Sequence, residues 1–232
     1  MAKYKHIFFD LDRTLWDMDR NASETLTEMY EKYGLRERGV PSADIFVEHY
    51  NTYNDLLWDR YRRRMIDKAT LRALRFKQTL AHFGVRDAKL ALNVENEFIL
   101  EAPRKTNLIP GAKELLDSLN NDYQLHIITN GFPEVQAHKM LHSGLTPYFD
   151  VIVTSEECGH AKPDAKIFAH ALKLAKGRKE EAIMIGDDLA VDIVGARESG
   201  WAHVFLNRTG GKHDEDVMHE VKELQEILHI IG

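Results

Sequence analysis

The pattern of apolar and polar positions changes twice along the chain. The segment HIFFDLD starts with an apolar run over residues 7–9 and ends in acidic residues, which is typical of a buried central strand of a parallel sheet. From about residue 16 to residue 105, apolar residues recur only at helical spacing. From residue 109 onward, short apolar runs alternate with helical patterns. The chain therefore predicts a strand, a helical block and a longer region of alternating strands and helices.

Local signals divide the helical block into separate helices. Asn21 and Glu24 can form a capping box, which predicts a helix start there, and Gly34 predicts the end of that helix. Pro41 and Ser42 predict the start of a longer helix. A further helix is expected over residues 87–102.

The region after residue 109 predicts an α/β fold. Strands are expected at residues 124–130, 150–155, 181–188 and 203–208. Helices are expected at residues 112–119, 133–141, 163–175, 191–200 and 221–228. Such alternation is typical of a Rossmann-like parallel sheet with helices on both faces. Because the helical block separates the first strand from the others, we expect an all-helical domain (16–105) inserted into a core formed by residues 1–15 and 106–232.

The net charge, one basic run and the single cysteine limit the kinds of partner and chemistry expected of the chain. The net charge of −6 argues against a nucleic acid polymer as partner. The basic run RYRRR over residues 60–64 is interpreted as a solvated helix face, with a clamp for an anionic ligand as the alternative. The single cysteine, Cys158, excludes an internal disulfide, and without a catalytic partner in view it is interpreted as a structural residue.

The apolar runs are too short to cross a bilayer, and the first residues lack the pattern of a secretory signal. We therefore expect no membrane partner and a cytoplasmic location. The sequence makes no prediction of oligomeric state.

Four small polar clusters follow apolar strands or precede helices. The carboxyl ends of parallel strands meet at one edge of a sheet, so the clusters are expected to converge there. They are Asp10-Leu11-Asp12-Arg13-Thr14; Thr129-Asn130-Gly131; Lys162-Pro163; and Gly186-Asp187-Asp188 with Asp192. Each alone has a plainer interpretation as a turn or a helix start. Together they offer paired carboxylates, phosphate-binding groups, a lysine and acidic ligands for a hard cation.

The order DLDRTL, ITNG, KP and GDDLAVD resembles the four motifs of the haloacid dehalogenase (HAD) superfamily. The match spans the α/β core, and the helical insertion is similar to the C1-type cap of that family. The stretches IITNGF and VTSEECGHAKPDAKIFAHAL, with NDLLWDRY in the cap, resemble the pyrimidine 5′-nucleotidase branch. One departure is Arg13, where many members of the family have glycine, so the backbone geometry near Asp12 is less predictable.

The resemblance implies a magnesium-dependent phosphomonoester hydrolase, and it assigns roles to the motif residues. Asp10 is the expected nucleophile, Asp12 the general acid and base, and Lys162 the cation beside the phosphate. Phosphate oxygens are expected at Thr129, Asn130, Gly131 and Lys162. The Asp10 side chain, the Asp12 backbone carbonyl and Asp187 would hold Mg2+. Supporting roles are expected for Thr14, Asp188 and Asp192, with Asp192 orienting Lys162 or a metal-bound water and Thr14 bracing the Asp10–Asp12 turn.

The substrate is expected to be a small phosphate monoester, and a nucleoside monophosphate is favoured. Trp16, Tyr53 and Trp58 are candidates for base stacking, with packing inside the cap as the plainer alternative. The alternatives are a phosphatase of sugar phosphates or phosphoglycolate, a phosphomutase and a dehalogenase, although a dehalogenase needs neither Asp12 nor Asp187. Outside enzymes, a receiver-like protein is disfavoured because the predicted nucleophile ends the first strand and a helical block is inserted. A phosphate-binding protein without activity is disfavoured because every position that the chemistry needs is filled.

Overall fold

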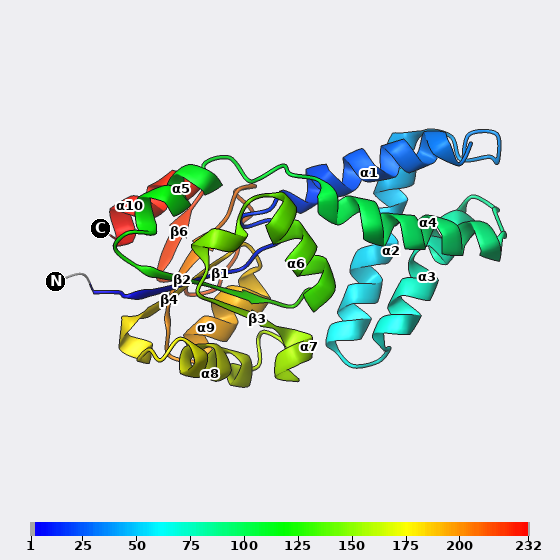
Figure 1. Cartoon of the computed structure of the whole chain (residues 1–232). Helices are drawn as coiled ribbons and strands as arrows, with labels where there is room; N and C mark the ends of the chain where they lie inside the picture. The colour runs from blue at the N-terminus through cyan, green and yellow to red at the C-terminus, as the bar shows by residue number, and fades with distance from the viewer. Residues whose placement is uncertain (1–2, 232) are drawn as a thin grey trace. The chain divides into compact units, whose positions relative to one another are not determined.

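The computed structural model describes residues 3–231 and confirms an α/β fold. Within these residues, six strands form one parallel sheet in the order β3-β2-β1-β4-β5-β6 (Figure 1). The strands are β1 (His6–Phe9), β2 (Gln124–Thr129), β3 (Val151–Thr154), β4 (Ala182–Gly186), β5 (Ala202–Leu206) and β6 (His219–Val221). The first strand of the chain is central, with β2 on one side and β4 on the other.

Helices cover both faces of this sheet (Figure 1). Side chains of successive strand residues point to opposite faces, so β1 sends Ile7 and Phe9 into one core and Phe8 into the other. The first core contains side chains of α5 (Ala112–Leu119) and α6 (Pro133–His142) and of the C-terminal turns η5 (Leu224–Ile227) and α10 (Leu228–Ile231). The second contains side chains of α8 (Ala165–Leu174) and α9 (Val194–Glu198). Both faces of the central strands are thus buried, which explains their continuous apolar runs.

The remaining short elements connect these layers. They are the four-residue helix α7 (Ser155–Cys158), the 3-10 turns η1 (Ala102–Arg104), η2 (Thr146–Tyr148) and η3 (Lys179–Glu181), and the π-helical turn η4 (Leu189–Ile193). Cys158 ends α7 and packs against the second core.

The inserted block consists of four helices within the described residues. They are α1 (Met18–Lys32), α2 (Ala43–Arg62), α3 (Lys68–His82) and α4 (Ala88–Glu101). Residues Asp19–Lys105 form one compact unit, and the chain up to Met18 together with the chain from Thr106 forms the other. The helical unit has its own apolar core, which includes Phe46, Tyr50 and Phe76. That this unit serves as a C1-type cap stays a prediction.

Two sequence-based interpretations of the block need correction. The first helix begins at Met18, so the proposed capping box lies inside it, and Asn21 is fully buried. Trp16 belongs with the α/β unit, because its backbone bridges to Asp12 and Leu108. The expected Ser42 cap is present, since its hydroxyl accepts a hydrogen bond from the Ile45 amide.

The C-terminal part also departs from expectation. Residues 221–228 were predicted to be one helix, but Val221 ends β6 and a short 3-10 turn starts only at Leu224. The helix expected at 191–200 is instead the π-helical turn η4 followed by five residues of α9.

Among the described residues, no helix combines the length and the apolar character that crossing a membrane requires.

Candidate active site

The site lies at the carboxyl ends of the three central strands. Asp10 follows β1, Thr129 ends β2 and Asp187 follows β4. The parallel register places Phe9 beside Ile127 on one side and Ile185 on the other, so the chain leaves the three strands at one level. The Asp10 amide continues this pairing by donating to the Ile185 carbonyl at 2.9 Å. The topology therefore brings together polar residues that are far apart in sequence.

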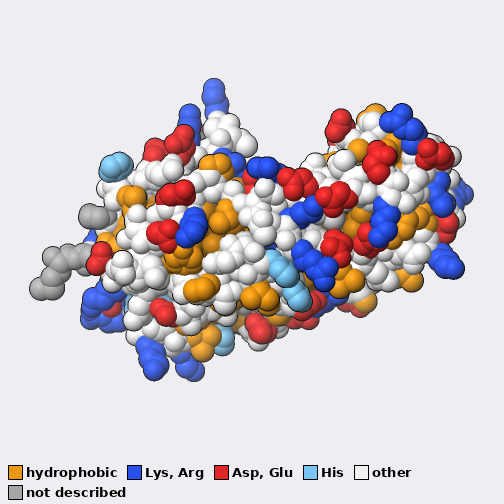
Figure 2. Space-filling model, turned by 45° about the horizontal axis from the view of Figure 1, so that its top comes forward, with side chains coloured by type: hydrophobic (Ala, Val, Ile, Leu, Met, Phe, Trp, Pro, Cys, Tyr) orange, Lys and Arg blue, Asp and Glu red, His pale blue; other side chains and the backbone are white. Residues whose placement is uncertain are grey.

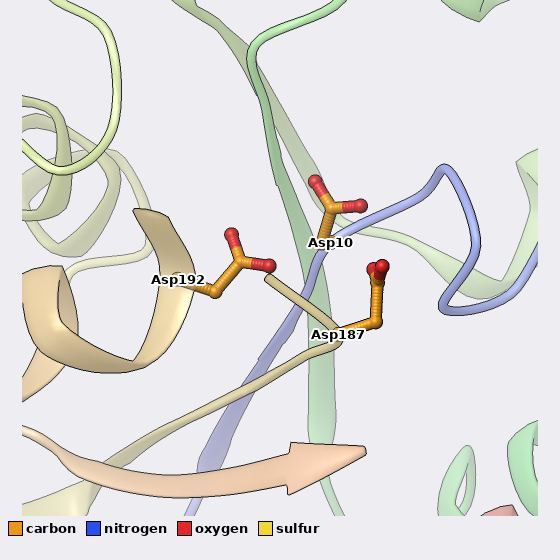
Figure 3. Close-up of side chains that lie close together, drawn as sticks. All are labelled: Asp10, Asp187 and Asp192. Atoms are coloured by element: carbon orange, nitrogen blue, oxygen red, sulfur yellow. The ribbon is translucent and has the colours of Figure 1, made fainter. Parts of the chain in front are cut away.

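Three carboxylates surround one small space (Figure 3). Asp10, Asp187 and Asp192 each offer an oxygen, and these oxygens lie within 4.8 Å of one another. Gly186 makes this approach possible, because a Cβ at that position would lie 2.3 Å from the Asp192 carboxylate. Three carboxylates at such distances repel one another unless cations offset their charge.

Lys162 supplies one cation. Its ammonium donates to Asp10 Oδ1 at 2.5 Å and to the Ile128 carbonyl at 2.6 Å, and it lies 2.6 Å from Asp192 Oδ1. The first two contacts are hydrogen bonds and the third is an ion pair, and the side chain is 1% exposed. Burial lowers the pKa of Lys162, but the attraction of the two carboxylates outweighs burial and leaves that pKa raised.

The crowded carboxyl groups of this site have raised pKa values. Burial, opposed by the Lys162 ammonium, raises the pKa of Asp10. Burial, followed by the charge of Asp192, raises the pKa of Asp187 to about 7. Hard oxygen donors in a region of concentrated negative charge suit Mg2+. The Asp10 and Asp187 side chains therefore offer the kind of donors that a magnesium site needs.

Asp12 lies beside this group and is held by a different set of contacts. Its Oδ2 accepts from Gln136 Nε2 at 3.0 Å, and its Oδ1 accepts from Lys139 Nζ at 2.6 Å. Both partners come from α6 and are buried. These two residues were not predicted as part of the site; their signal in the sequence is a polar pair at i and i+3 in the helix that follows the Thr129-Asn130-Gly131 cluster.

The second cluster is organised around Lys162 and α6. The Asn130 side-chain amide donates to the Lys162 carbonyl at 3.0 Å and accepts from the Lys162 amide at 2.8 Å. These two hydrogen bonds fix the backbone that carries Lys162, and the expected role of Asn130 in holding phosphate stays a prediction. The Thr129 oxygen accepts from Gln136 Nε2 at 2.7 Å and from the Gly131 amide at 3.1 Å. Because both contacts are accepted, the Thr129 O–H is left to donate to a ligand.

The supporting residues also have specific contacts. The Thr14 hydroxyl donates to Asp187 Oδ1 at 2.7 Å and so joins the first cluster to the fourth, while its expected bracing of the Asp10–Asp12 turn stays a prediction. Asp192 contacts Lys162, as its expected role requires. The Asp188 carboxylate caps η4 by accepting from the amides of Ala190 and Val191, which agrees with the plainer interpretation of a helix-start acid.

Arg13 adopts a backbone conformation that few side chains favour. Its φ is +64°, in the left-handed region where glycine has no steric penalty. The family's usual glycine therefore fits the observed geometry, and Arg13 occupies the same conformation at some cost. Its positive charge acts to lower the pKa of Asp187, against the raising effects of burial and Asp192.

The candidates for base stacking differ in accessibility. Trp16 is 1% exposed, and its ring lies 4.5 Å from Lys139 Nζ, so it is a packing residue rather than a stacking platform. Tyr53 and Trp58 are half-buried in the helical unit. Arg62, Arg63 and Arg64 are exposed, and Arg63 pairs with Asp59 at 3.1 Å, as expected of a solvated surface. However, α2 ends at Arg62, so Arg63 and Arg64 lie in the turn after the helix. On the face shown in Figure 2, charged side chains of both signs are interspersed.

Comparison with known proteins gives consistent matches. The model of the haloacid dehalogenase-like hydrolase family matches residues 4–200. Pyrimidine 5′-nucleotidase PynA of Streptococcus pneumoniae is 34% identical over 206 residues, covering 88% of this chain and 84% of PynA. Pyrimidine 5′-nucleotidase YjjG of Escherichia coli is 32% identical over 232 residues, covering 96% of this chain and 98% of YjjG. The magnesium-bound crystal structure of the HAD-hydrolase YfnB of Bacillus subtilis superposes with a TM-score of 0.87 at 25% identity, covering 99% of each chain.

Proposed function

Since this chain belongs to the haloacid dehalogenase-like hydrolase family, we propose that it is a magnesium-dependent 5′-nucleotidase that acts through an aspartyl-phosphate intermediate. The family match confirms the resemblance predicted from the four clusters, and the relatives identify the protein as an enzyme of the phosphatase type. The observation that carries the mechanistic proposal is the position of the Asp10 carboxylate. Asp10 directly follows the central strand, and its carboxylate lies 2.5 Å from the Lys162 ammonium and beside two further carboxylates.

The proposed reaction has two steps. An Asp10 oxygen bonds to phosphorus while the P–O bond of the ester breaks; the ester oxygen keeps the electron pair and takes a proton from Asp12. A water oxygen then bonds to phosphorus, gives a proton to Asp12 and displaces the Asp10 oxygen. This second step releases inorganic phosphate and restores both side chains. One difficult displacement is thus divided into two easier ones.

Other residues bind the phosphate and offset its charge. Lys162 and the Thr129 hydroxyl would contact phosphate oxygens, with the Gly131 backbone beside them. Asp10, Asp187 and the Asp12 backbone carbonyl would hold Mg2+, which supplies positive charge that offsets the repulsion between the phosphate and Asp10. Asn130 and Asp192 would keep Lys162 in place. A nucleotide substrate is supported by the two pyrimidine 5′-nucleotidase relatives, and a cytoplasmic location remains a prediction from the sequence.

Phosphate release from a panel of esters tests the proposal. The panel contains nucleoside monophosphates, sugar phosphates and phosphoglycolate, each with magnesium and with a chelator. The matched variant is Asp10→Asn, which keeps the size of the side chain and removes the nucleophilic carboxylate. We expect magnesium-dependent release that is fastest with nucleoside monophosphates and absent in the variant.

Other outcomes separate the parts of the proposal. Preference for a sugar phosphate would keep the phosphatase mechanism and reject nucleotides as the substrate class. Turnover by a folded Asp10→Asn variant at the wild-type rate would remove Asp10 as the nucleophile. A folded wild-type protein that releases phosphate from no ester would favour a phosphomutase or a dehalogenase.

A further inference from the structure

Two side chains of α6 hold both oxygens of the Asp12 carboxylate. Gln136 Nε2 donates to Oδ2 at 3.0 Å, and Lys139 Nζ donates to Oδ1 at 2.6 Å. We propose that Gln136 and Lys139 are positioning residues that fix the orientation of the Asp12 carboxyl for proton exchange with the ester oxygen. This inference rests on the proposed function, in which Asp12 is the general acid and base.

The surroundings of Lys139 hold its ammonium group beside Asp12. Its side chain is 7% exposed, and a charge buried to that degree is strongly unfavourable without a partner. Asp12 supplies the opposite charge. The Trp16 ring lies 4.5 Å from Nζ, and the Met18 sulfur lies 4.0 Å away. A buried aromatic ring stabilises an ammonium group and leaves little room for another rotamer. The lysine is therefore a fixed donor aimed at Asp12.

Gln136 links Asp12 to the Thr129-Asn130-Gly131 cluster. Its two amide N–H groups serve two acceptors, Asp12 Oδ2 and, at 2.7 Å, the Thr129 hydroxyl oxygen. Rotating the amide by half a turn would place its own oxygen against a carboxylate, so these two acceptors determine its orientation. This orientation is kept although Gln136 Oε1 has no hydrogen-bond partner among the described residues. Gly131 provides the space, because a Cβ there would lie 2.4 Å from the Gln136 amide.

The loop that carries Asp12 is held as well. The Arg13 amide donates to the Trp16 carbonyl at 2.9 Å, and the Trp16 amide donates to the Leu11 carbonyl at 2.9 Å. The Trp16 backbone thus holds the loop, and the side chains from α6 hold the Asp12 carboxylate. A general acid contributes only when it lies within hydrogen-bonding reach of the leaving oxygen, so its orientation affects the rate directly.

The leaving group of the substrate distinguishes this role from a structural one. An alkoxide, as in a nucleoside monophosphate, needs a proton as it departs, whereas 2,4-dinitrophenolate does not. The ratio kcat/KM reports on steps up to release of the leaving group. We would compare kcat/KM for two esters, a nucleoside monophosphate as the alkyl ester and 2,4-dinitrophenyl phosphate as the aryl ester. The proteins compared are wild type, Lys139→Met and Gln136→Met. Lys173→Met, which removes an exposed lysine of α8, is the matched control.

For Lys139→Met we expect kcat/KM on the alkyl ester to fall by about 10²-fold, within the range for losing general acid catalysis. On 2,4-dinitrophenyl phosphate the loss should stay within roughly 3-fold, since protonation adds little there. Gln136→Met should show the same selectivity, and Lys173→Met should match wild type on both esters.

Equal losses on the two esters would overturn the inference, because they would indicate a role in phosphate binding or in folding. Unchanged kcat/KM on the alkyl ester would overturn it as well. If circular dichroism shows that Lys139→Met does not fold, the same comparison is made with Gln136→Met, which removes a hydrogen-bond donor without removing a charge. Its result then tests the inference. Failure of the proposed function is recognised separately, since wild type would then hydrolyse neither ester.

Discussion

At the scale of single residues, the site is organised by contacts between buried charges. Lys162 contacts two carboxylates and one carbonyl, and Asn130 fixes its backbone through a pair of hydrogen bonds. Removing one member of such a network leaves a buried charge without its partner, which is strongly destabilising. The position of Lys162 relative to Asp10 is therefore a property of the whole network rather than of one ion pair.

The Thr14 hydroxyl offers a test of magnesium binding. It donates to Asp187 Oδ1 at 2.7 Å and so orients an expected metal ligand. We predict that Thr14→Val, which keeps the shape of the side chain, raises the magnesium concentration for half-maximal activity by about 10-fold, as is typical when such a supporting partner is lost. The measurement is a magnesium titration of phosphate release.

Thr25→Val is the control for this titration, because the Thr25 hydroxyl bonds a helix carbonyl, that of Asn21, in the helical unit. An unchanged magnesium requirement in Thr14→Val would show that the hydroxyl does not orient Asp187 toward the metal.

The residues of the site differ in how far the sequence could predict them. Asp10, Thr129 and Asp187 follow apolar strands, and the parallel register alone brings strand ends together. Gln136 and Lys139 were missed because burial of a polar side chain depends on what lies opposite, and Asp12 is more than 120 residues away in sequence. For the same reason the tasks of Asn130 and Thr14 became clear only from their partners.

At the scale of elements, the end of α8 has a turn usually completed by glycine. Lys176 follows the C-cap with a φ of +54°, while the Gly177 amide donates to the Leu172 carbonyl. We predict that Lys176→Gly increases the free energy of unfolding by about 1 kcal/mol, because glycine has no steric penalty in this conformation. Urea unfolding followed by circular dichroism measures the change.

Lys173→Gly on the same helix should have the opposite effect, with a loss of about 1 kcal/mol from lower helix propensity. Destabilisation by Lys176→Gly would mean that contacts of the lysine side chain outweigh the backbone effect.

The two central strands β1 and β2 carry a buried histidine pair. His6 Nδ1 lies 3.1 Å from His126 Nε2, and His126 is 1% exposed. Burial, followed by the proximity of His6, lowers the pKa of His126 to about 4 from the ordinary 6.5. The unfolded chain then binds a proton near pH 6.5 that the folded protein binds only near pH 4. The contribution to stability is complete above pH 6.5 and is lost as the pH falls toward 4.

We predict that melting temperatures measured from pH 7 to pH 4 fall less steeply in His126→Phe than in wild type, whatever the absolute stability of the variant. His170→Gln, which changes an exposed histidine, should keep the wild-type slope. Identical slopes in wild type and His126→Phe would show that this histidine does not contribute to acid sensitivity.

The strands and helices were predicted best where an apolar run or a helical periodicity extends over many residues. The apolar runs of β1, β2 and β4 and the long helices of the insertion follow from periodicity. The edge strand β6 was missed because His219-Glu220-Val221 has one buried apolar residue in three and owes its extended form to pairing with β5. The π-helical turn η4 depends on the Asp188 cap and on the position of Asp192, which no local propensity indicates.

At the scale of the whole molecule, the two units have separate apolar cores. The cores contain different residues, with Phe76 in the helical unit and Ile183 in the α/β unit. The tryptophans are also divided: Trp16 and Trp201 are buried in the α/β unit, and Trp58 is in the helical unit. Two spectroscopic probes can therefore follow the units separately.

We predict that Phe76→Ala destabilises the helical unit by about 3–5 kcal/mol. The test is made in a Trp58→Phe background, where the remaining tryptophans report on the α/β unit. With Phe76→Ala, the unfolding transition followed by circular dichroism should begin at a lower urea concentration, while the transition followed by tryptophan fluorescence moves less. Ile183→Ala should mainly move the fluorescence transition. Equal displacement of both probes by both variants would instead indicate that the units unfold as one cooperative system.

The central position of β1 has a consequence for synthesis. Translation makes this strand first, yet its neighbours β2 and β4 come after the whole helical insertion. At a rate of about 5–20 residues per second, Thr129 follows Phe9 by on the order of 10 s. During that interval the ribosome completes the helical unit, while the apolar strand that precedes Asp10 has no partner strand. The nascent chain must therefore keep this apolar strand, which is buried in the folded protein, from aggregating until the distant strands emerge.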